Sequence, residues 1–497
     1  FYSLEEKTER GAGWSRKEWA YARMGDRFIS RVPAAVQQDI SKTLTEADAY
    51  ISDYNIFMGN LRNDAGEQLF PKGMKLITHW GLRDELKSNY ADPERGLERQ
   101  RMIYQVMQRI IDQSIPREVI NSGTYTWNPE TNELFTGGNV ATGTPEETRR
   151  YEVFLKNFHA MRQLDAYSPH YPTQLVRAFD ATMEVPQKDV ESLFVGLLSS
   201  PQVKEVAAFI TSRLGRGLEP FDIWYNGFKG GKGIPEEQLT ALTSRKYLDA
   251  AALEKDLPNI LVKLGWNPDK AKEISRLRTR IGEGGMDYKG YNIAVHEFGH
   301  NVEQTITMND VDYYMLSGVP NTSFTEAVAF LFQKRDLELL GLKDSDSSEA
   351  HWLALSSFWS AYEIMGVSLV DIRVWEWLYA HPDATAAELK EAVIAIAREV
   401  WNSYYAGVLG GKDETLLGIY SHMIDYPLYL SNYPMGHLID FQIEQQVKGK
   451  NLAEEIDRMY TRGSIIPQLW MQHAVGSPIS IDPLLSATEE ALAALKQ

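Results

Sequence analysis

Residues 295–300 read Val-His-Glu-Phe-Gly-His, and the interpretation of the whole chain starts from this stretch. On an α-helix, residues four positions apart lie on the same face, one turn above the other. His296 and His300 can therefore direct two imidazole nitrogens at a single metal ion. Glu297 is offset around the helix and can reach a water bound to that ion. The spacing predicts a metal site on a helix.

Apolar residues surround the motif at positions 291, 293, 294, 295 and 298, which predicts a buried helix. Two histidines and a glutamate on a buried helix are costly unless they are paired or bound to a metal. Histidine ligands four residues apart, with an intervening glutamate as general base, are typical of zinc metallopeptidases.

Composition limits the classes of function. The chain has 497 residues, 43% of them hydrophobic, and a formal net charge of −17. The length permits a large core and about three domains. The charge argues against nucleic acid and anionic membranes as partners and is compatible with neutral or cationic peptides. With no cysteine, any metal must be held by His and carboxylate ligands.

No apolar run is expected to form a membrane span. The first residue is Phe1, so we expect a trimmed N-terminus from which a signal sequence could have been removed. A soluble protein, either cytoplasmic or exported, is the expectation, with the compartment left open.

Hydrophobic periodicity and capping signals predict a mainly α protein with few strands. A loop or small hairpin is predicted at 123–145 and a short strand at 282–291. Helices are predicted to begin at Asp92-Pro93, at Asp189, near Ser323, at the capping box of Thr385 and Glu388, and at Pro434.

A catalytic zinc site needs a third protein ligand. Glu326 is the best candidate, because an apolar helical run follows it. The alternative is that Ser323 and Glu326 form a capping box at a helix start. The rival acids Glu303, Asp310 and Asp312 lie closer to the motif.

The motif resembles that of the gluzincin oligopeptidases, which are the thimet oligopeptidase and oligoendopeptidase F family and the related angiotensin-converting enzyme family. The resemblance rests on His-Glu-Phe-Gly-His, on Phe-Thr-Glu-Ala at 324–327, and on Leu-Glu-Pro-Phe-Asp-Ile-Trp-Tyr at 218–225. It covers about residues 200–450. It implies that Glu326 is the third zinc ligand. Phe330 departs from the converting enzymes, which have an aspartate at that position.

The resemblance also implies a large helical, two-lobed fold around a deep substrate channel, with a short edge strand beside the zinc helix. Gly285 would lie in the strand that aligns the substrate. Residues 181–497 are predicted to form the catalytic region, and residues 1–180 a helical region that serves as channel wall or lid.

A second constellation lies near the C-terminus. His422, Tyr429 and Tyr433 match a segment in which these families carry a histidine followed by tyrosines. The resemblance implies that His422 and Tyr433 stabilise an oxyanion and that Tyr429 contacts substrate. Tyr426 remains an alternative to both tyrosines, and simple packing is the alternative for all three. His437 is expected on a helix face and His79 in a structural role.

The sequence therefore predicts a zinc-dependent peptidase that hydrolyses short peptides with a zinc-activated water. One alternative is a zinc exopeptidase of the dipeptidyl carboxypeptidase type, and another is a helical peptide-binding protein with an idle metal site. The converting enzymes anchor the substrate carboxylate with a lysine where this chain has Tyr420, which favours internal cleavage. Peptide preference and oligomeric state are left open.

Overall fold

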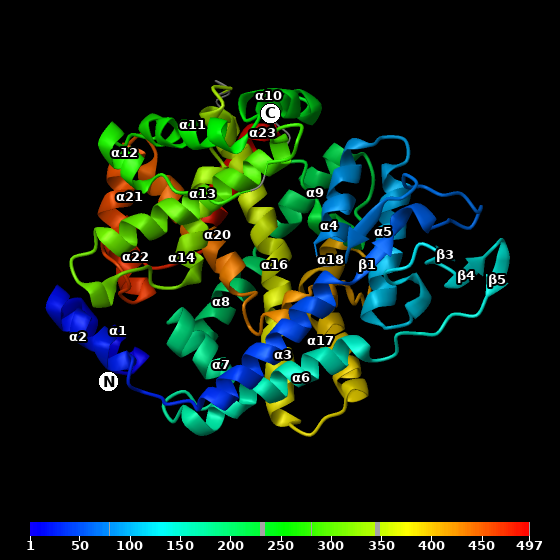
Figure 1. Ribbon diagram of the computed structural model, residues 1–497, viewed down its shortest axis with the longest axis horizontal. Helices are drawn as coiled ribbons and strands as arrows, with labels where there is room; N and C mark the ends of the chain where they lie inside the picture. The colour runs from blue at the N-terminus through cyan, green and yellow to red at the C-terminus, as the bar shows by residue number, and fades with distance from the viewer. Residues whose placement is uncertain (79, 229–233, 280, 343–347, 497) are drawn as a thin grey trace.

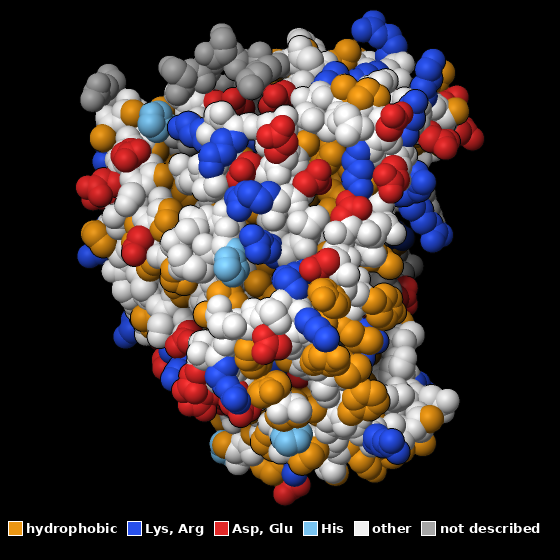
Figure 2. Space-filling model, turned by 90° about the vertical axis from the view of Figure 1, so that its left-hand side faces the viewer, with side chains coloured by type: hydrophobic (Ala, Val, Ile, Leu, Met, Phe, Trp, Pro, Cys, Tyr) orange, Lys and Arg blue, Asp and Glu red, His pale blue; other side chains and the backbone are white. Residues whose placement is uncertain are grey.

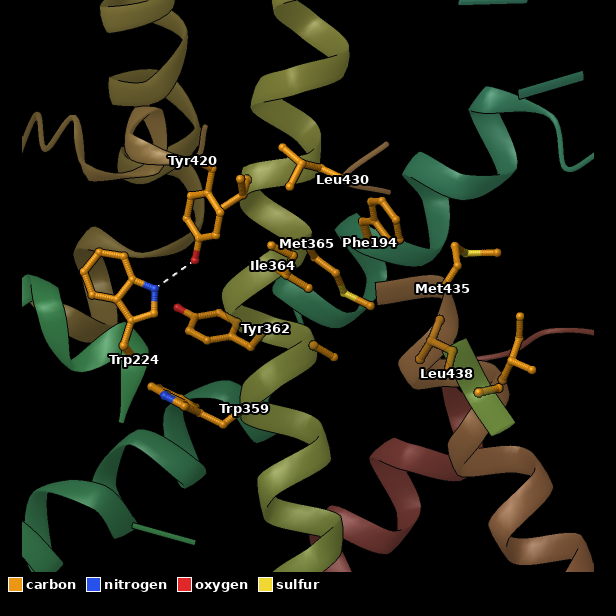
Figure 3. Packing of buried hydrophobic residues seen from close by; sticks show 14 of the residues in the cluster. Phe194, Trp224, Trp359, Tyr362, Ile364, Met365, Tyr420, Leu430, Met435 and Leu438 are labelled. Carbon is orange, nitrogen blue, oxygen red and sulfur yellow. Dashed lines mark hydrogen bonds between the residues drawn. The ribbon is translucent and has the colours of Figure 1, made fainter. Parts of the chain in front are cut away.

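A long helix, α16 (Glu349–Ala380), runs through the middle of the computed structural model, with other helices packed around it (Figure 1). It is apolar on nearly every face, as a helix enclosed by a core should be. Its side chains meet Phe194 of α8 and Met435 and Leu438 of α20 (Figure 3). Its length and hydropathy would suit a membrane span, but 78% of its most apolar window is buried inside the protein. We attribute its apolarity to the core.

The structure describes residues 1–78, 80–228, 234–279, 281–342 and 348–496. The helices lie in two lobes on either side of α16, which confirms the mainly α, two-lobed fold (Figure 1). One hydrophobic core includes residues from both the N-terminal and the C-terminal parts of the chain. The division near residue 180 remains a prediction.

The first part of the chain contains the following helices: α1 (Leu4–Arg10), α2 (Arg16–Asp26), α3 (Ala34–Ser52), α4 (Gly81–Ser88), α5 (Gly96–Ile111), α6 (Arg149–Arg162), α7 (Gln174–Val176), α8 (Gln187–Leu198) and α9 (Gln202–Leu214). The short turn of helix η7 (Pro220–Trp224) follows them.

The second part contains α10 (Glu236–Lys246), α11 (Ala250–Lys263), α12 (Pro268–Ile274), α13 (Tyr288–Asn309), α14 (Thr322–Gln333), α15 (Asp336–Leu339), α16, α17 (Ala386–Tyr404), α18 (Ala406–Leu409), α19 (His422–Asp425), α20 (Asn432–Val447), α21 (Leu452–Tyr460), α22 (Pro467–Val475) and α23 (Asp482–Leu495).

Two small antiparallel sheets complete the described fold. In the first, β1 (Asn55–Phe57) pairs with β2 (Lys75–Ile77), and Ile56 lies opposite Leu76. In the second, β4 (Glu133–Thr136) lies between β3 (Thr126–Asn128) and β5 (Asn139–Ala141). The loop or hairpin predicted at 123–145 is therefore a three-stranded meander.

Local signals predicted some helix starts better than others. The capping box of Thr385 and Glu388 is present at the start of α17. The helix expected at Asp92-Pro93 begins later, at Gly96. The reason is that Asp92 Oδ1 accepts hydrogen bonds from the backbone N–H groups of Glu94 and Arg95 and holds them in a turn.

Opposite charges are interspersed on the face drawn in Figure 2, where Lys and Arg side chains alternate with Asp and Glu. A broad basic field, which a nucleic-acid-binding surface would need, is not seen on this face.

Candidate metal centre and the facing tyrosine–histidine segment

The helix α13 carries the motif. The Asp287 side chain caps its N-terminus by accepting a hydrogen bond from the Gly290 backbone N–H. Tyr291, Val295 and Phe298 are buried, as the sequence predicted. Ile293 is exposed instead, and so is Glu297 one turn further on. Glu297 therefore lies on the open side of the helix.

The helix α14 lies against α13 and carries Glu326. Its N-cap is Asn321, whose side chain accepts from the Ser323 backbone N–H. The capping box considered for Ser323 and Glu326 is not formed, so the Glu326 carboxylate is available to face α13.

Two glycines permit the close helix contacts at this point. A Cβ added to Gly299 of α13 would lie 2.8 Å from Ala329 Cα and 3.0 Å from the Val328 carbonyl oxygen. A Cβ on Gly436 of α20 would lie 3.3 Å from Glu326 Cβ. Small residues at these two positions let α14 approach both neighbours closely.

The crossing of α13 and α14 brings the three predicted ligands together. Glu326 Oε2 lies 3.6 Å from His296 Nε2 and 3.8 Å from His300 Nε2. One ligand atom from each of the three residues fits within 4.8 Å of the others. Donor atoms around a tetrahedral zinc ion are roughly 3.4 Å apart. The donor set and its spacing therefore fit a zinc ion.

The Nδ1 atoms of both histidines have partners that the sequence did not identify. His296 Nδ1 lies 3.2 Å from Gln333 Oε1, and Gln333 in turn donates from Nε2 to Asn292 Oδ1. His300 Nδ1 lies 2.9 Å from Thr325 Oγ1. An Nδ1–H donated to these oxygens leaves the Nε2 lone pairs pointing toward Glu326.

Burial favours the neutral form of all three groups, which metal binding requires of the two histidines but not of Glu326. It lowers the pKa of His296 and brings the pKa of His300 down to about 4, so both imidazoles are neutral at pH 7. Burial, with the Glu297 carboxylate as the second cause, raises the pKa of Glu326 to about 7. A cation between the three groups would offset the cost of ionising Glu326.

The rival acids lie outside the group of three donors. Asp310 pairs with Lys270 at 2.5 Å, and Asp312 pairs with Arg16 at 2.5 Å. Glu303 is buried at 1% exposure and accepts a hydrogen bond from Thr307 Oγ1. Phe330 stands where the converting enzymes have an aspartate, and its ring packs 5.5 Å from that of His296 and stacks on His437.

The second constellation is built around α19 and the start of α20. Tyr433 Oη lies 3.1 Å from His422 Nε2, and the Tyr429 ring stacks on the His422 ring with centroids 6.2 Å apart. Between them the backbone turns at Leu428, whose φ is +60°. The structure thus joins all three predicted residues into one cluster.

This cluster faces Glu326. Tyr433 stands one helical turn before Gly436, which touches Glu326. Burial first and the Glu326 carboxylate second raise the pKa of Tyr433 to about 12, and the same two causes raise that of Tyr429. Both phenols therefore keep their protons at pH 7. Burial, followed by the Arg83 guanidinium, lowers the pKa of His422 to about 4.

Tyr420 is not part of the open cluster. It is 2% exposed, its Oη donates to Glu363 Oε1 at 2.7 Å, and it accepts from Trp224 Nε1 at 2.8 Å (Figure 3). The guanidinium of Arg83, from α4, lies 4.3 Å over its ring. Both sides of the phenol oxygen are thus already used.

A cavity of about 320 Å³ opens beside His422 and Tyr433. The N-terminal region supplies one wall through α3 and β2, and the segment 422–433 supplies the other. A larger cavity of about 690 Å³ continues along α3. The N-terminal region therefore borders the cluster, and its role as a channel wall or lid stays a prediction.

The segment before α13 differs from the prediction. Instead of a short strand, residues 282–285 form a tight turn closed by a bridge between Gly282 and Gly285. Gly285 has φ +88°, and a Cβ there would lie 2.3 Å from the Ser244 carbonyl oxygen. The glycine is required for this turn, and its predicted contact with substrate stays a prediction. His79 lies outside the described residues.

Comparison with known proteins defines the fold. Neither a family model nor a curated protein sequence matches this chain. Solved structures of peptidases match nearly all of it, which shows that the chain has the fold of oligoendopeptidase F and supports the predicted resemblance.

Three structures illustrate the likeness. A PZ peptidase A with an inhibitor and a putative oligoendopeptidase F each have a TM-score of 0.60 and 12% identity, over 99% of this chain and 81% of theirs. An oligoendopeptidase F from Enterococcus faecium has a TM-score of 0.53 and 11% identity, over 99% of this chain and 79% of its own.

Proposed function

We propose that this protein is a zinc-dependent metallopeptidase of the gluzincin type that hydrolyses short peptides. The observation that carries the proposal is the meeting of His296, His300 and Glu326 at one point, with their donor atoms 3.6–3.8 Å apart across the helix crossing. Glu297 on the open side of α13 and the donors of His422 and Tyr433 supply the groups that peptide hydrolysis needs.

His296, His300 and Glu326 would hold the zinc ion. When bound there, zinc acts as a Lewis acid that lowers the pKa of a coordinated water and polarises the substrate carbonyl. Two neutral imidazoles and one carboxylate leave the ion with a net charge of about +1, which preserves this acidity.

Glu297 is the general base. It accepts a proton as water attacks the scissile carbonyl, and it passes that proton to the leaving amine. Tyr433 donates a hydrogen bond to the oxygen that becomes negative in the transition state. In the tautomer that carries Nε2–H, His422 donates to the Tyr433 hydroxyl oxygen at 3.1 Å, which leaves the single phenol proton for the substrate.

The two cavities next to the tyrosine–histidine cluster support short peptides as substrates. Both have α3 on one side and residues of the segment 422–433 on the other, so a substrate in them would lie between two walls. An extended peptide can enter such a space, whereas a folded protein cannot. We expect fragments of a protein to be cleaved faster than the folded protein itself.

The first alternative is an exopeptidase that captures the substrate's C-terminal carboxylate. Tyr420 is buried and already makes two hydrogen bonds, which argues against it as an anchor. Arg83 is the nearby cation that could serve, although Glu363 lies 3.8 Å from it and balances its charge. Two results together would favour the exopeptidase. Amidation of the peptide's C-terminus would abolish cleavage by the wild type, and Arg83→Gln would abolish cleavage of the unmodified peptide.

The second alternative is a peptide-binding protein with an idle metal. Glu297→Gln separates the two classes, because it keeps the side-chain size and removes the basicity. We expect bound zinc at wild-type level and a fall in hydrolysis of a mixed peptide library, read by mass spectrometry, of at least ~10²-fold. A wild-type protein that binds zinc and peptide but cleaves none of the library would support the binding protein.

A further inference from the structure

The two cavities described above share four lining residues: Asp48, Asp425, Tyr426 and Tyr429. We call this junction the acidic pocket. The smaller cavity connects it directly to His422 and Tyr433. A group bound in the acidic pocket would therefore lie close to the proposed oxyanion donors.

Asp425 is an unusual residue for such a position. It is 7% exposed, and its Oδ1 has no hydrogen-bond partner. The nearby cation Arg150 donates to the carbonyl oxygens of Gly418 and Ile419. A buried carboxylate oxygen without a partner makes ionisation of the group costly unless a cation arrives to pair with it.

The other groups that face the pocket add to the negative charge. Asp48 on α3 is exposed and stands across from Asp425 in both cavities. Among the residues that the structure describes, the walls of the two cavities contain no lysine or arginine. Asp48 and Asp425 are therefore the acidic side chains of these walls, and no lysine or arginine among the described wall residues balances them.

Aromatic rings complete the surroundings. Trp80 is 51% exposed and lines the smaller cavity, and Tyr426 is 53% exposed and lines both. The rings of Tyr426 and Tyr429 lie 5.5 Å apart. Aromatic faces beside carboxylates attract an organic cation through both the ring quadrupole and the negative charge.

We propose that the acidic pocket binds a lysine or arginine side chain of the peptide substrate, near the scissile bond, with Asp425 and Asp48 as the charge partners. The inference rests on the proposed function and names the substrate class of the same site. It makes the protein selective for peptides with a basic residue close to the point of cleavage.

The protonation of Asp425 agrees with this assignment. Burial, with the Asp48 carboxylate as a further cause and against the Arg150 guanidinium, raises the pKa of Asp425 to about 7. A cationic side chain would draw this carboxyl into its ionised form. The preference for basic residues should therefore grow between pH 6 and pH 8.

The test uses pairs of peptides that differ only by lysine or glutamine at one position, scanned along the peptide. We expect the lysine peptide to show the higher kcat/KM at one position near the bond cut. Asp425→Asn should lower the lysine-to-glutamine ratio by roughly 10–100-fold, and Asp48→Asn should lower it less, because Asp48 is exposed to water. Asp53→Asn, at the exposed end of α3 and outside both cavity linings, is the matched control.

Binding of the same peptides to Glu297→Gln, measured by calorimetry, separates this inference from the proposed function. Lysine-selective binding with no cleavage by the wild type would overturn the peptidase and retain the acidic pocket. If the wild type and both Asp variants cleave the peptides with the same lysine-to-glutamine ratio of kcat/KM, the acidic pocket is overturned and the peptidase is retained.

N-terminal acetylation distinguishes the two sources of cation in a peptide. If N-terminal acetylation lowers kcat/KM and the exchange of lysine for glutamine leaves it unchanged, the pocket binds the terminal ammonium and the side-chain assignment is wrong. If selectivity survives acetylation and disappears on exchange of lysine, the assignment stands.

Discussion

The two halves of the proposed site are built in different ways. The metal half comes from two regular helices, α13 and α14, whose geometry fixes the donor atoms through spacing along the helix and one close crossing at Gly299. The tyrosine–histidine half comes from a short helix, a turn at Leu428 and the first turn of α20. Local periodicity aligns the two histidines of the first half, and one helix crossing adds Glu326, whereas the second half depends throughout on packing against distant segments.

The largest effect should follow from breaking the metal half. Removing any one of His296, His300 or Glu326 by substitution with Ala leaves two ligands, too few to retain zinc. We expect metal content, measured by elemental analysis, to fall to background and hydrolysis to fall with it. His437→Ala is the control, because His437 stacks on Phe330 without joining the donor set. Full zinc occupancy in Glu326→Ala would place the third ligand elsewhere.

This difference explains how much of the site the sequence predicted. His296 and His300 are four residues apart on one helix, so their common direction follows from helical geometry alone. The assignment of Glu326 as the third ligand came from the family resemblance, because only tertiary packing sets α14 against α13. Gln333 and Thr325 were missed for the same reason: nothing in their local sequence shows that they lie behind the histidine rings.

The fold shows the same limit. Helices with clear caps or long apolar faces were predicted, as at Thr385. The predicted start of α5 was wrong, because Asp92 stabilises a turn there. The strand expected at 282–291 is a turn instead, since Gly285 meets the Ser244 backbone. Side-chain and backbone contacts of this kind are settled by three-dimensional neighbours that a pattern along the chain does not contain.

The next effect tests the tyrosine–histidine half. Tyr433→Phe removes one hydroxyl and should lower kcat by roughly 10–10³-fold with little change in KM, because the hydrogen bond forms in the transition state. Steady-state kinetics on one short peptide measure both constants. Tyr429→Phe, on the ring stacked over His422, should act mainly on KM. The reverse result would exchange the roles of the two tyrosines.

A smaller effect should come from the groups behind the ligands. Gln333→Ala and Thr325→Val remove the acceptors of the histidine Nδ1–H groups and should weaken zinc binding by roughly 10–100-fold. Competition with a chelator measures the affinity. Gln304→Ala, an exposed glutamine on the same helix α13, should bind zinc like the wild type. Equal affinity in all three variants would mean that the crossing alone orients the rings.

The smallest effect concerns stability. The folded-state pKa of Asp425, about 7, lies above its ordinary value of 3.8, so ionisation of this carboxyl destabilises the folded state as pH rises from about 4 to 7. Asp425→Asn should therefore be more stable than the wild type by about 1–3 kcal/mol at pH 8, and equally stable below pH 4. Urea unfolding at both pH values measures the difference, with Asp53→Asn as a neutral reference.

The position of Trp80 gives the molecule an optical signal of its own. Its indole is half exposed in the wall of the smaller cavity, whereas most of the other tryptophans, such as Trp224, Trp359 and Trp470, are fully buried. A peptide lying in that cavity would exclude water from Trp80 and leave the buried indoles in place. Intrinsic fluorescence, excited at the red edge of tryptophan absorption, would then follow substrate arrival and product departure in real time without any attached dye.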